Sequence, residues 1–261
     1  MNVVSYGGGT NSTAMLIGMY QREIPVDLIL FADTGAERPE TYAYLDIFDG
    51  WLTSHGLPKI ERLSYHTEDG VQQTLETELL QRRQLPSIAY GAKKCSQKYK
   101  IFVQETYCNN HPLCQAAWEG GEKVNKYIGY DAGERRRIQN ATVYDMQDKK
   151  YKKVYALYEW DWDRDDCKSV IQDMGLPFPG KSSCFFCPST KKHELLELRR
   201  VHPELLKRAL AIEDNAKETL TTIKGLGRNW SWRDYLDGKD NQVMFCGMMT
   251  DIDTPCGCYD G

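Results

Sequence analysis

Ser5-Tyr6-Gly7-Gly8-Gly9-Thr10-Asn11-Ser12-Thr13 lies between a strand-forming run and a helix-forming run of the sequence. Val3 and Val4 before it favour an extended strand. The segment from Thr13 to Glu23 has the length and apolar content of a helix packed on a sheet. The three glycines are therefore expected where a buried strand turns into a helix.

A strand-to-helix turn of this kind is suited to binding an anion. The N–H groups at a helix start have no intrahelical partners, and the helix dipole favours negative charge there. Glycine permits unusual dihedral angles and removes the Cβ that would block close approach. Asn11 and Ser12 can cap the helix or hydrogen-bond the anion. The spacing matches neither the Walker motif nor the dinucleotide fingerprint, and the alternative is a purely structural turn.

The composition is that of a globular protein. Hydrophobic residues make up 41% and charged residues 27% of the 261 residues, which predicts one large domain with an appendage rather than a disordered chain. The formal net charge of -4 argues against a protein whose whole surface is basic and binds nucleic acid. It is compatible with a local basic groove.

Signals for export and membrane insertion are missing from the sequence. No basic region precedes a long apolar run, and no stretch of about 18 apolar residues occurs. We therefore expect a cytoplasmic protein with no membrane association. The nine cysteines are unevenly spaced, which indicates free thiols and metal ligands rather than a disulfide framework.

Strand and helix patterns alternate after the first helix. Val26 to Phe31 has the apolar run of a strand buried on both faces, Pro39 opens a helix to about Ser54, and Ile60 to Tyr65 forms a third strand. This alternation of strands and helices predicts an α/β fold with a doubly wound, mostly parallel sheet. Ligands of such sheets lie beyond the carboxyl ends of the strands.

The loop Asp33-Thr34-Gly35 follows the second expected strand, so it shares a crevice with Gly7–Ser12 if the two strands are neighbours. Asp33 has three possible roles there: it orients a ribose, binds a metal that is bonded to phosphate, or caps the loop. Further elements are a helix at 71–84, a strand at 124–129, helices at 163–174, 190–201 and 203–222, and an irregular tail at 225–261.

Two segments carry clustered cations. Lys93-Lys94-Cys95-Ser96-Gln97-Lys98-Tyr99-Lys100 places four lysines around a cysteine, where they can hold phosphates or lower the thiol pKa. Arg135, Arg136 and Arg137 follow the strand at 124–129 and can clamp a phosphate or sulfate, although at most two of them face one site. In both segments the alternative is a solvated helix face.

Cys184-Phe185-Phe186-Cys187 is the clearest metal or redox motif in the chain. Two thiolates with this spacing can bind one tetrahedral centre, and a dithiol redox pair is the alternative. A metal needs more ligands, for which the sequence offers Cys95, Cys246, Cys256, Cys258 and His193.

Together, the motifs resemble the phosphoadenosine phosphosulfate (PAPS) reductase family, within the PP-loop adenine-nucleotide enzymes. Gly7–Thr13 is similar to the Ser-Gly-Gly-x-Asp-Ser loop, and Asp33-Thr34-Gly35 with Pro39-Glu40-Thr41 is similar to the Asp-Thr-Gly and Pro-Glu-Thr pattern. Cys95 with Lys100 resembles the Cys-Cys-x-x-x-Lys segment, and Cys184-x-x-Cys187 resembles the later pair. The resemblance covers residues 2 to 215.

The resemblance implies a nucleotide-binding domain at 1–183 and a helical, cysteine-containing extension with a tail at 184–261. The implied ligand is an adenine nucleotide (PAPS, APS or ATP), with a [4Fe-4S] cluster or, alternatively, zinc. The implied nucleotide-binding residues are Ser5, Gly7, Gly8, Gly9, Asn11, Ser12, Thr13, Asp33, Thr34, Gly35, Gly129, Arg135 and Arg136. The implied metal ligands are Cys95, Cys184, Cys187 and Cys246, and the implied catalytic residues are Cys256, Cys258 and Lys100.

The chain departs from the family pattern at three places. Ser96 replaces the second cysteine of the pair, so a fourth metal ligand must come from elsewhere. Gly7 stands where the group often has Ser and Asn11 where the pyrophosphatase branch has Asp, which weakens the case for ATP hydrolysis. The tail Pro255-Cys256-Gly257-Cys258 keeps the Cys-Gly core of the reductase tail without its Glu and His.

Three hypotheses follow from the sequence. In the first, a tail thiolate attacks the sulfur of a bound sulfonucleotide while Lys93, Lys94, Lys100 and one arginine stabilise charge, and a thiol electron donor is the partner. In the second, an ATP pyrophosphatase activates a nucleic-acid or small acceptor for sulfur transfer. In the third, the chain is a nucleotide-binding module without catalytic activity. The sequence leaves the oligomeric state open.

Overall fold

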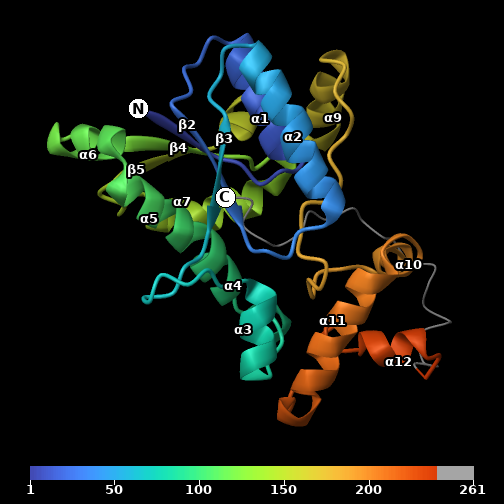
Figure 1. Ribbon diagram of the computed structural model, residues 1–261. Coiled ribbons are helices and arrows are strands. Elements are labelled where there is room, and N and C mark those ends of the chain that lie inside the picture. The colour runs from blue at the N-terminus through green and yellow to red at the C-terminus, as the bar shows by residue number, and fades with distance from the viewer. Residues whose placement is uncertain (240–261) are drawn as a thin grey trace.

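A five-stranded parallel sheet lies at the centre of the computed structural model, which describes residues 1–239 (Figure 1). Its strand order is β3-β2-β1-β4-β5, and every neighbouring pair is parallel. The strands are β1 (Asn2–Ser5), β2 (Leu28–Asp33), β3 (Ile60–Ser64), β4 (Val124–Ile128) and β5 (Tyr151–Val154). The α/β class with a parallel sheet is confirmed.

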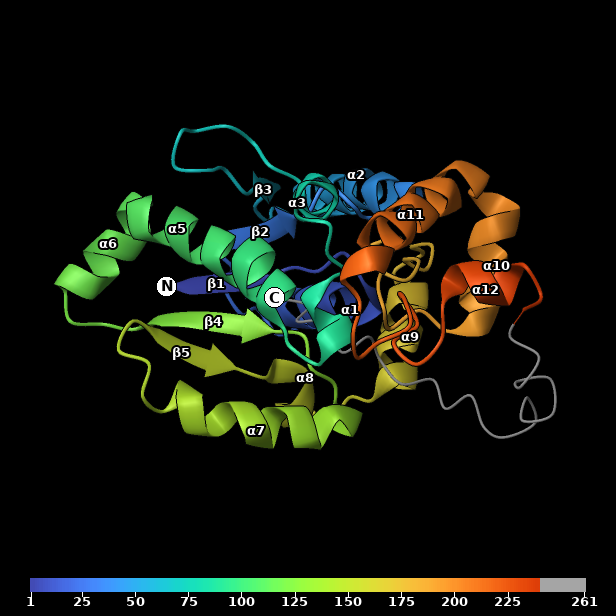
Figure 2. The same ribbon diagram turned by 90° about the horizontal axis from the view of Figure 1, so that it is seen from below.

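Helices cover both faces of the sheet. Val4 of β1 packs in a core with α1 (Thr10–Gln21), α2 (Pro39–Ser54) and α9 (Arg164–Asp173), whereas its neighbour Val3 packs in a second core with α5 (Phe102–Asn110) and α6 (Pro112–Glu119). Side chains alternate between the faces of a strand, so the apolar run of β1 supplies both cores. Figure 2 shows β4 and β5 side by side, with α7 (Arg135–Asp145) along them.

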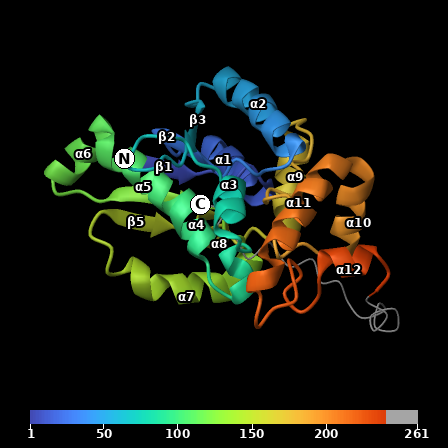
Figure 3. The same cartoon turned by 60° about the horizontal axis from the view of Figure 1, so that its bottom comes forward.

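A third apolar core lies beyond the sheet. It joins α3 (Leu75–Arg82) to three helices from the end of the described chain: α10 (Lys192–Val201), α11 (Pro203–Ala216) and α12 (Trp232–Leu236). Figure 3 shows these helices grouped to one side of the sheet. This core contains Leu75 and Leu79 as well as Leu195 and Leu206. It therefore includes residues from both sides of the domain boundary expected after residue 183.

Several boundaries differ from those expected from the sequence. The helix expected at 203–222 ends as α11 at Ala216 and continues as the 3-10 turn η4 (Lys217–Thr219). The tail expected to be irregular contains α12, because buried Glu213 accepts hydrogen bonds from Ser231 Oγ (2.6 Å) and the N–H groups of Trp232 (3.0 Å) and Arg233 (2.8 Å). A carboxylate with several donors satisfies the open start of a helix.

The other helical elements are short. They are η1 (Ser87–Tyr90), α4 (Lys94–Ser96), the π-helix η2 (Gln97–Ile101), η3 (Ala132–Glu134) and α8 (Ala156–Glu159). None of the helices in the described part of the chain combines the length and apolar character needed to cross a membrane.

The strand order changes direction between β1 and β4, so their carboxyl ends form the switch point at which ligands of open α/β sheets bind. Gly129 follows β4 and lies against the start of α1. A Cβ at this position would be 3.0 Å from both N and Cα of Ser12. Since those atoms are backbone, they cannot move aside without shifting α1.

We expect Gly129→Ala to lower the free energy of unfolding by about 1–3 kcal/mol, because an added methyl group strains a packed site. Gly50→Ala in α2 is the matched control, because its Cβ would have no neighbour within 4 Å. This change should raise the same free energy by about 0.5–1 kcal/mol. Urea unfolding measures both, and equal effects of the two substitutions would contradict the close approach.

Candidate functional site

The glycine-rich loop opens directly onto the N-terminus of α1. Gly8 has φ +72°, a left-handed conformation that glycine adopts readily, and Gly9 is the N-cap residue in extended conformation with no side-chain cap. The N–H of Thr13 donates to Gly9 O at 3.1 Å, so the N–H groups of the three residues before Thr13 precede this first helical bond. The first turn contains no acidic side chain, and this helix end is therefore suited to an anion.

The hydroxyl groups of the loop hold its shape. Ser12 Oγ accepts from the N–H of Gly7 at 3.2 Å and lies 3.3 Å from Gly9 O, to which it donates. Ser5 Oγ donates to Gln104 Oε1 at 2.7 Å, and Thr13 Oγ1 lies 3.1 Å from Tyr6 OH. Burial raises the pKa of Tyr6 well above its ordinary value, so this phenol stays neutral. The side chains that make these hydrogen bonds are buried.

Asn11 links the loop to the segment after β4 across the switch point. Its Nδ2 donates to Asp131 Oδ2 at 2.9 Å and to Glu134 Oε2 at 3.3 Å, and its Oδ1 accepts from Arg164 Nη1 at 2.7 Å. Asp131 and Glu134 are buried and form a capping box on η3. An aspartate at position 11 would add a third carboxylate to this buried pair, which explains why an amide fits here.

Asp33 closes its own loop. Its Oδ1 accepts from the N–H of Gly35 at 2.7 Å and from Tyr42 OH at 2.8 Å. Burial, with the nearby Asp33 carboxylate, raises the pKa of Tyr42. Of the three roles expected for Asp33, these contacts are those of a loop cap.

Cys95 and the distant pair Cys184 and Cys187 line one small cavity. Cys95, Cys184 and Cys187 surround a space of about 20 Å³, together with Thr34 and Lys100. Thr34 Oγ1 lies 3.3 Å from Cys184 Sγ, and Lys100 Nζ lies 3.9 Å from Glu37 Oε1. We call the three cysteines the thiol centre. It adjoins the loop that follows β2.

The segment around Cys184 joins the thiol centre to the glycine-rich loop and to the loop after β2. Ser182 Oγ donates to Gly7 O, and the N–H of Phe185 donates to Ala36 O at 2.9 Å. Ser182 did not emerge as a site residue from the sequence. The only signal for it was the pair of small polar residues directly before Cys184.

The thiol centre offers soft ligands suited to zinc or an iron–sulfur cluster. Within residues 1–239, however, no three His, Cys, Asp or Glu side chains lie in an arrangement that holds a metal ion. The three thiols fit the donor type of such a centre, but they do not form a complete site. Cys246, the expected fourth ligand, and the expected catalytic residues Cys256 and Cys258 lie outside the described residues.

The arginines at the start of α7 lie at the surface or pair with a neighbouring acid. Arg135 and Arg136 are exposed, and the Arg135 guanidinium lies 6.0 Å from the ring centroid of Tyr158. Arg137 pairs with Glu134. The guanidinium that reaches the glycine-rich loop is that of Arg164, which no motif indicated. The roles assigned to the individual residues stay predictions.

No protein-family model matches the chain, and no curated protein matches it. Among solved structures, the chain is similar to phosphoadenylyl-sulfate (PAPS) reductase from Candida auris in a phosphate complex, with a TM-score of 0.39 and 16% sequence identity. The match covers 68% of this chain and 73% of the other. That reductase belongs to the family that the sequence motifs resemble.

Proposed function

We propose that the chain is a PAPS reductase-like enzyme that binds an adenine nucleotide at the glycine-rich loop and carries out sulfur chemistry beside it. One observation carries the proposal: Cys184 lies 3.3 Å from Thr34 Oγ1, in a segment whose Ser182 bonds Gly7 of the loop. The anion site and the thiol centre are therefore built from adjoining segments.

The loop is the site for the nucleotide phosphates. The open N–H groups and dipole of α1 favour negative charge, and the buried hydroxyl groups hold the shape of the loop. The candidate ligands are PAPS, APS and ATP, which share the adenosine and its phosphate.

In the reductive reaction that we propose, the thiolate of Cys256 or Cys258 attacks the sulfur of the sulfonucleotide. A sulfur–sulfur bond forms, the bond from sulfur to the bridging phosphate oxygen breaks, and the adenosine phosphate leaves. A thiol electron donor then reduces the thiosulfonate, which releases sulfite and restores the cysteine. Lys100, which lines the small cavity of the thiol centre, would stabilise charge on the sulfate and phosphate oxygens.

Reduced protein incubated with APS or PAPS should release sulfite or carry a thiosulfonate on Cys256 or Cys258, which mass spectrometry of tryptic peptides detects. Cys167→Ser is the control, because Cys167 is buried in α9. Absence of both products with either sulfonucleotide would overturn the reductive reaction.

A second candidate function is activation of an acceptor by ATP, with release of pyrophosphate and sulfur transfer from the thiol centre. It is favoured by an open cleft of about 900 Å³, because Cys95 lines this cleft as well as the small cavity. A cleft on the thiol centre provides room for an acceptor larger than the nucleotide. Pyrophosphate released from ATP only when an acceptor is present would support this function.

Gly9→Asp should weaken nucleotide binding on the order of tenfold or more, because a carboxylate at the N-cap competes for the N–H groups and repels phosphate. The fold should tolerate the change. Gly9 is extended (φ -108°, ψ 179°), and its Cβ would make an ordinary contact of 3.5 Å with Ser182. Calorimetric titration with ATP and APS measures the loss.

Gly9→Ser is the matched control for charge, because serine caps a helix without a negative charge. It should lose less affinity than Gly9→Asp, while both variants unfold at or above the wild-type urea midpoint. Unchanged nucleotide affinity in Gly9→Asp would place the nucleotide elsewhere.

A metal centre is the third element of the proposal. Cys95, Cys184 and Cys187 would hold an iron–sulfur cluster or zinc, with Cys246 as the fourth ligand, and the bound centre would supply electrons, sulfur or structural rigidity. Protein purified without oxygen should contain iron with sulfide, or zinc. Cys184→Ser and Cys187→Ser should lose this metal, as elemental analysis measures.

Cys167→Ser is again the control and should retain the wild-type metal content. The same content in Cys184→Ser, Cys187→Ser and the wild type would remove the metal centre from the proposal. Iron with sulfide would identify a cluster, whereas zinc alone would identify a structural or binding site.

A further inference from the structure

The open cleft lies between α3, η1 and the π-helix η2, and it is separate from the glycine-rich loop. Cys95 lines both this cleft and the small cavity of the thiol centre. The cleft has a volume of about 900 Å³, near the upper end of the range for ligand pockets. The cleft therefore gives a large ligand access to one cysteine of the thiol centre.

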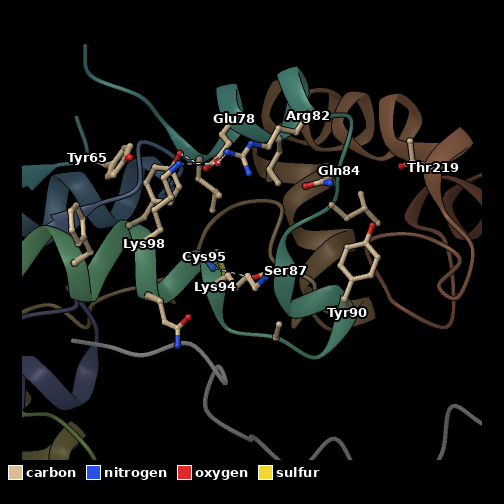
Figure 4. A pocket seen from close by; sticks show the side chains of 17 residues that line it. Tyr65, Glu78, Arg82, Gln84, Ser87, Tyr90, Lys94, Cys95, Lys98 and Thr219 are labelled. Carbon is tan, nitrogen blue, oxygen red and sulfur yellow. Dashed lines mark hydrogen bonds and ion pairs between the residues drawn. The ribbon is translucent and has the colours of Figure 1, made fainter. Parts of the chain in front are cut away.

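Aromatic side chains stand at both ends of the cleft. Tyr65 lies 5.2 Å from Tyr99 and 6.2 Å from Phe102 between ring centroids, and these three rings form one group. Figure 4 shows Tyr65 and Tyr90 at opposite ends, with Cys95 between them. Phe102 is 54% exposed and Tyr90 is 46% exposed, so both rings present surface on which a planar group can stack.

The charge of the lining is positive. The lining contains three cations, Arg82, Lys94 and Lys98, and one carboxylate, that of Glu78. Burial alone would raise the pKa of Glu78, but hydrogen bonds from Lys98 and Tyr99 hold it below its ordinary value, so Glu78 is ionised. Glu78 lies 2.8 Å from Lys98 Nζ and 3.1 Å from Arg82 Nη2, and the exposed Lys94 adds a further cation. The cleft thus favours an anionic ligand.

One short segment serves both spaces. In the π-helix Gln97–Ile101, Tyr99 lines the cleft and its neighbour Lys100 lines the small cavity. Single π-turns of this kind are rare and occur frequently at functional sites. This turn places an aromatic ring and a cation on the two sides of the thiol centre.

From these observations we infer that the cleft binds a segment of single-stranded nucleic acid as the acceptor of the proposed sulfur chemistry. Separated aromatic platforms with cations between them are the chemistry that recognises successive bases and their phosphates. A duplex keeps its bases stacked on one another and cannot offer them to the rings. The inference rests on the proposed function for the chemistry at Cys95, but binding in the cleft can be tested by itself.

The test is fluorescence anisotropy of end-labelled single-stranded oligonucleotides of about ten nucleotides, in DNA and RNA form, titrated with the full chain. Phe102→Ala and Tyr90→Ala should each weaken binding on the order of tenfold, since a stacking ring is lost. Lys94→Glu should weaken binding to all sequences and reduce its dependence on salt. Both ring variants should fold, because these side chains are exposed.

Two matched controls separate the cleft from the rest of the surface. Phe178 is 54% exposed, as Phe102 is, and lies in the loop after α9, so Phe178→Ala should bind the oligonucleotide as the wild type does. Lys59 is exposed and precedes β3, at the amino edge of the sheet, so Lys59→Glu makes the same charge change away from the cleft.

Equal affinity for duplex and single strand, or unchanged affinity in Phe102→Ala and Tyr90→Ala, would overturn the inference. Competition by a free mononucleotide at the same affinity would also overturn it, because the cleft would then bind a single nucleotide. Gly9→Asp distinguishes the two proposals. This variant should bind the oligonucleotide with wild-type affinity while its affinity for ATP falls. The two binding sites can therefore be tested independently of each other.

Discussion

The close approach of β4 to the start of α1 is the constraint on which the site depends. Gly129 lies against the backbone of Ser12, and Asn11 reaches across to Asp131 and Glu134. This contact joins the two halves of the sheet at the point where the strand order changes direction. It fixes the orientation of α1, and with it the direction of the N–H groups that make the loop an anion site.

The same constraint gives a physical account of Asn11. An isolated helix start would accept Asn or Asp equally well. Here the side chain faces a buried carboxylate pair on one side and Arg164 on the other, so the amide can donate to the acids and accept from the guanidinium. The amide at position 11 is therefore explained by its local hydrogen bonds.

The thiol centre depends on a second set of contacts. Ser182 and Phe185 attach the segment around Cys184 to the loops after β1 and β2, while the turn at Gln97–Ile101 brings Cys95 and Lys100 from the other side. The helices α10 to α12 pack on α3 and hold these segments together from outside. The glycine-rich loop thus adjoins the thiol centre, and the thiol centre shares Cys95 with the open cleft.

Local pattern alone determined the parallel sheet, the helix from Pro39 to Ser54 and the glycine-rich turn, because these depend on apolar runs and on residues with strong conformational preferences. The tertiary structure decided the partners of Asn11, the contact of Asp33 with Tyr42, the contact of Arg164 with Asn11 and the gathering of three cysteines in one cavity. Those contacts join residues more than a hundred positions apart in several cases, and spacing along a chain carries no information about which distant side chains meet once the cores have packed.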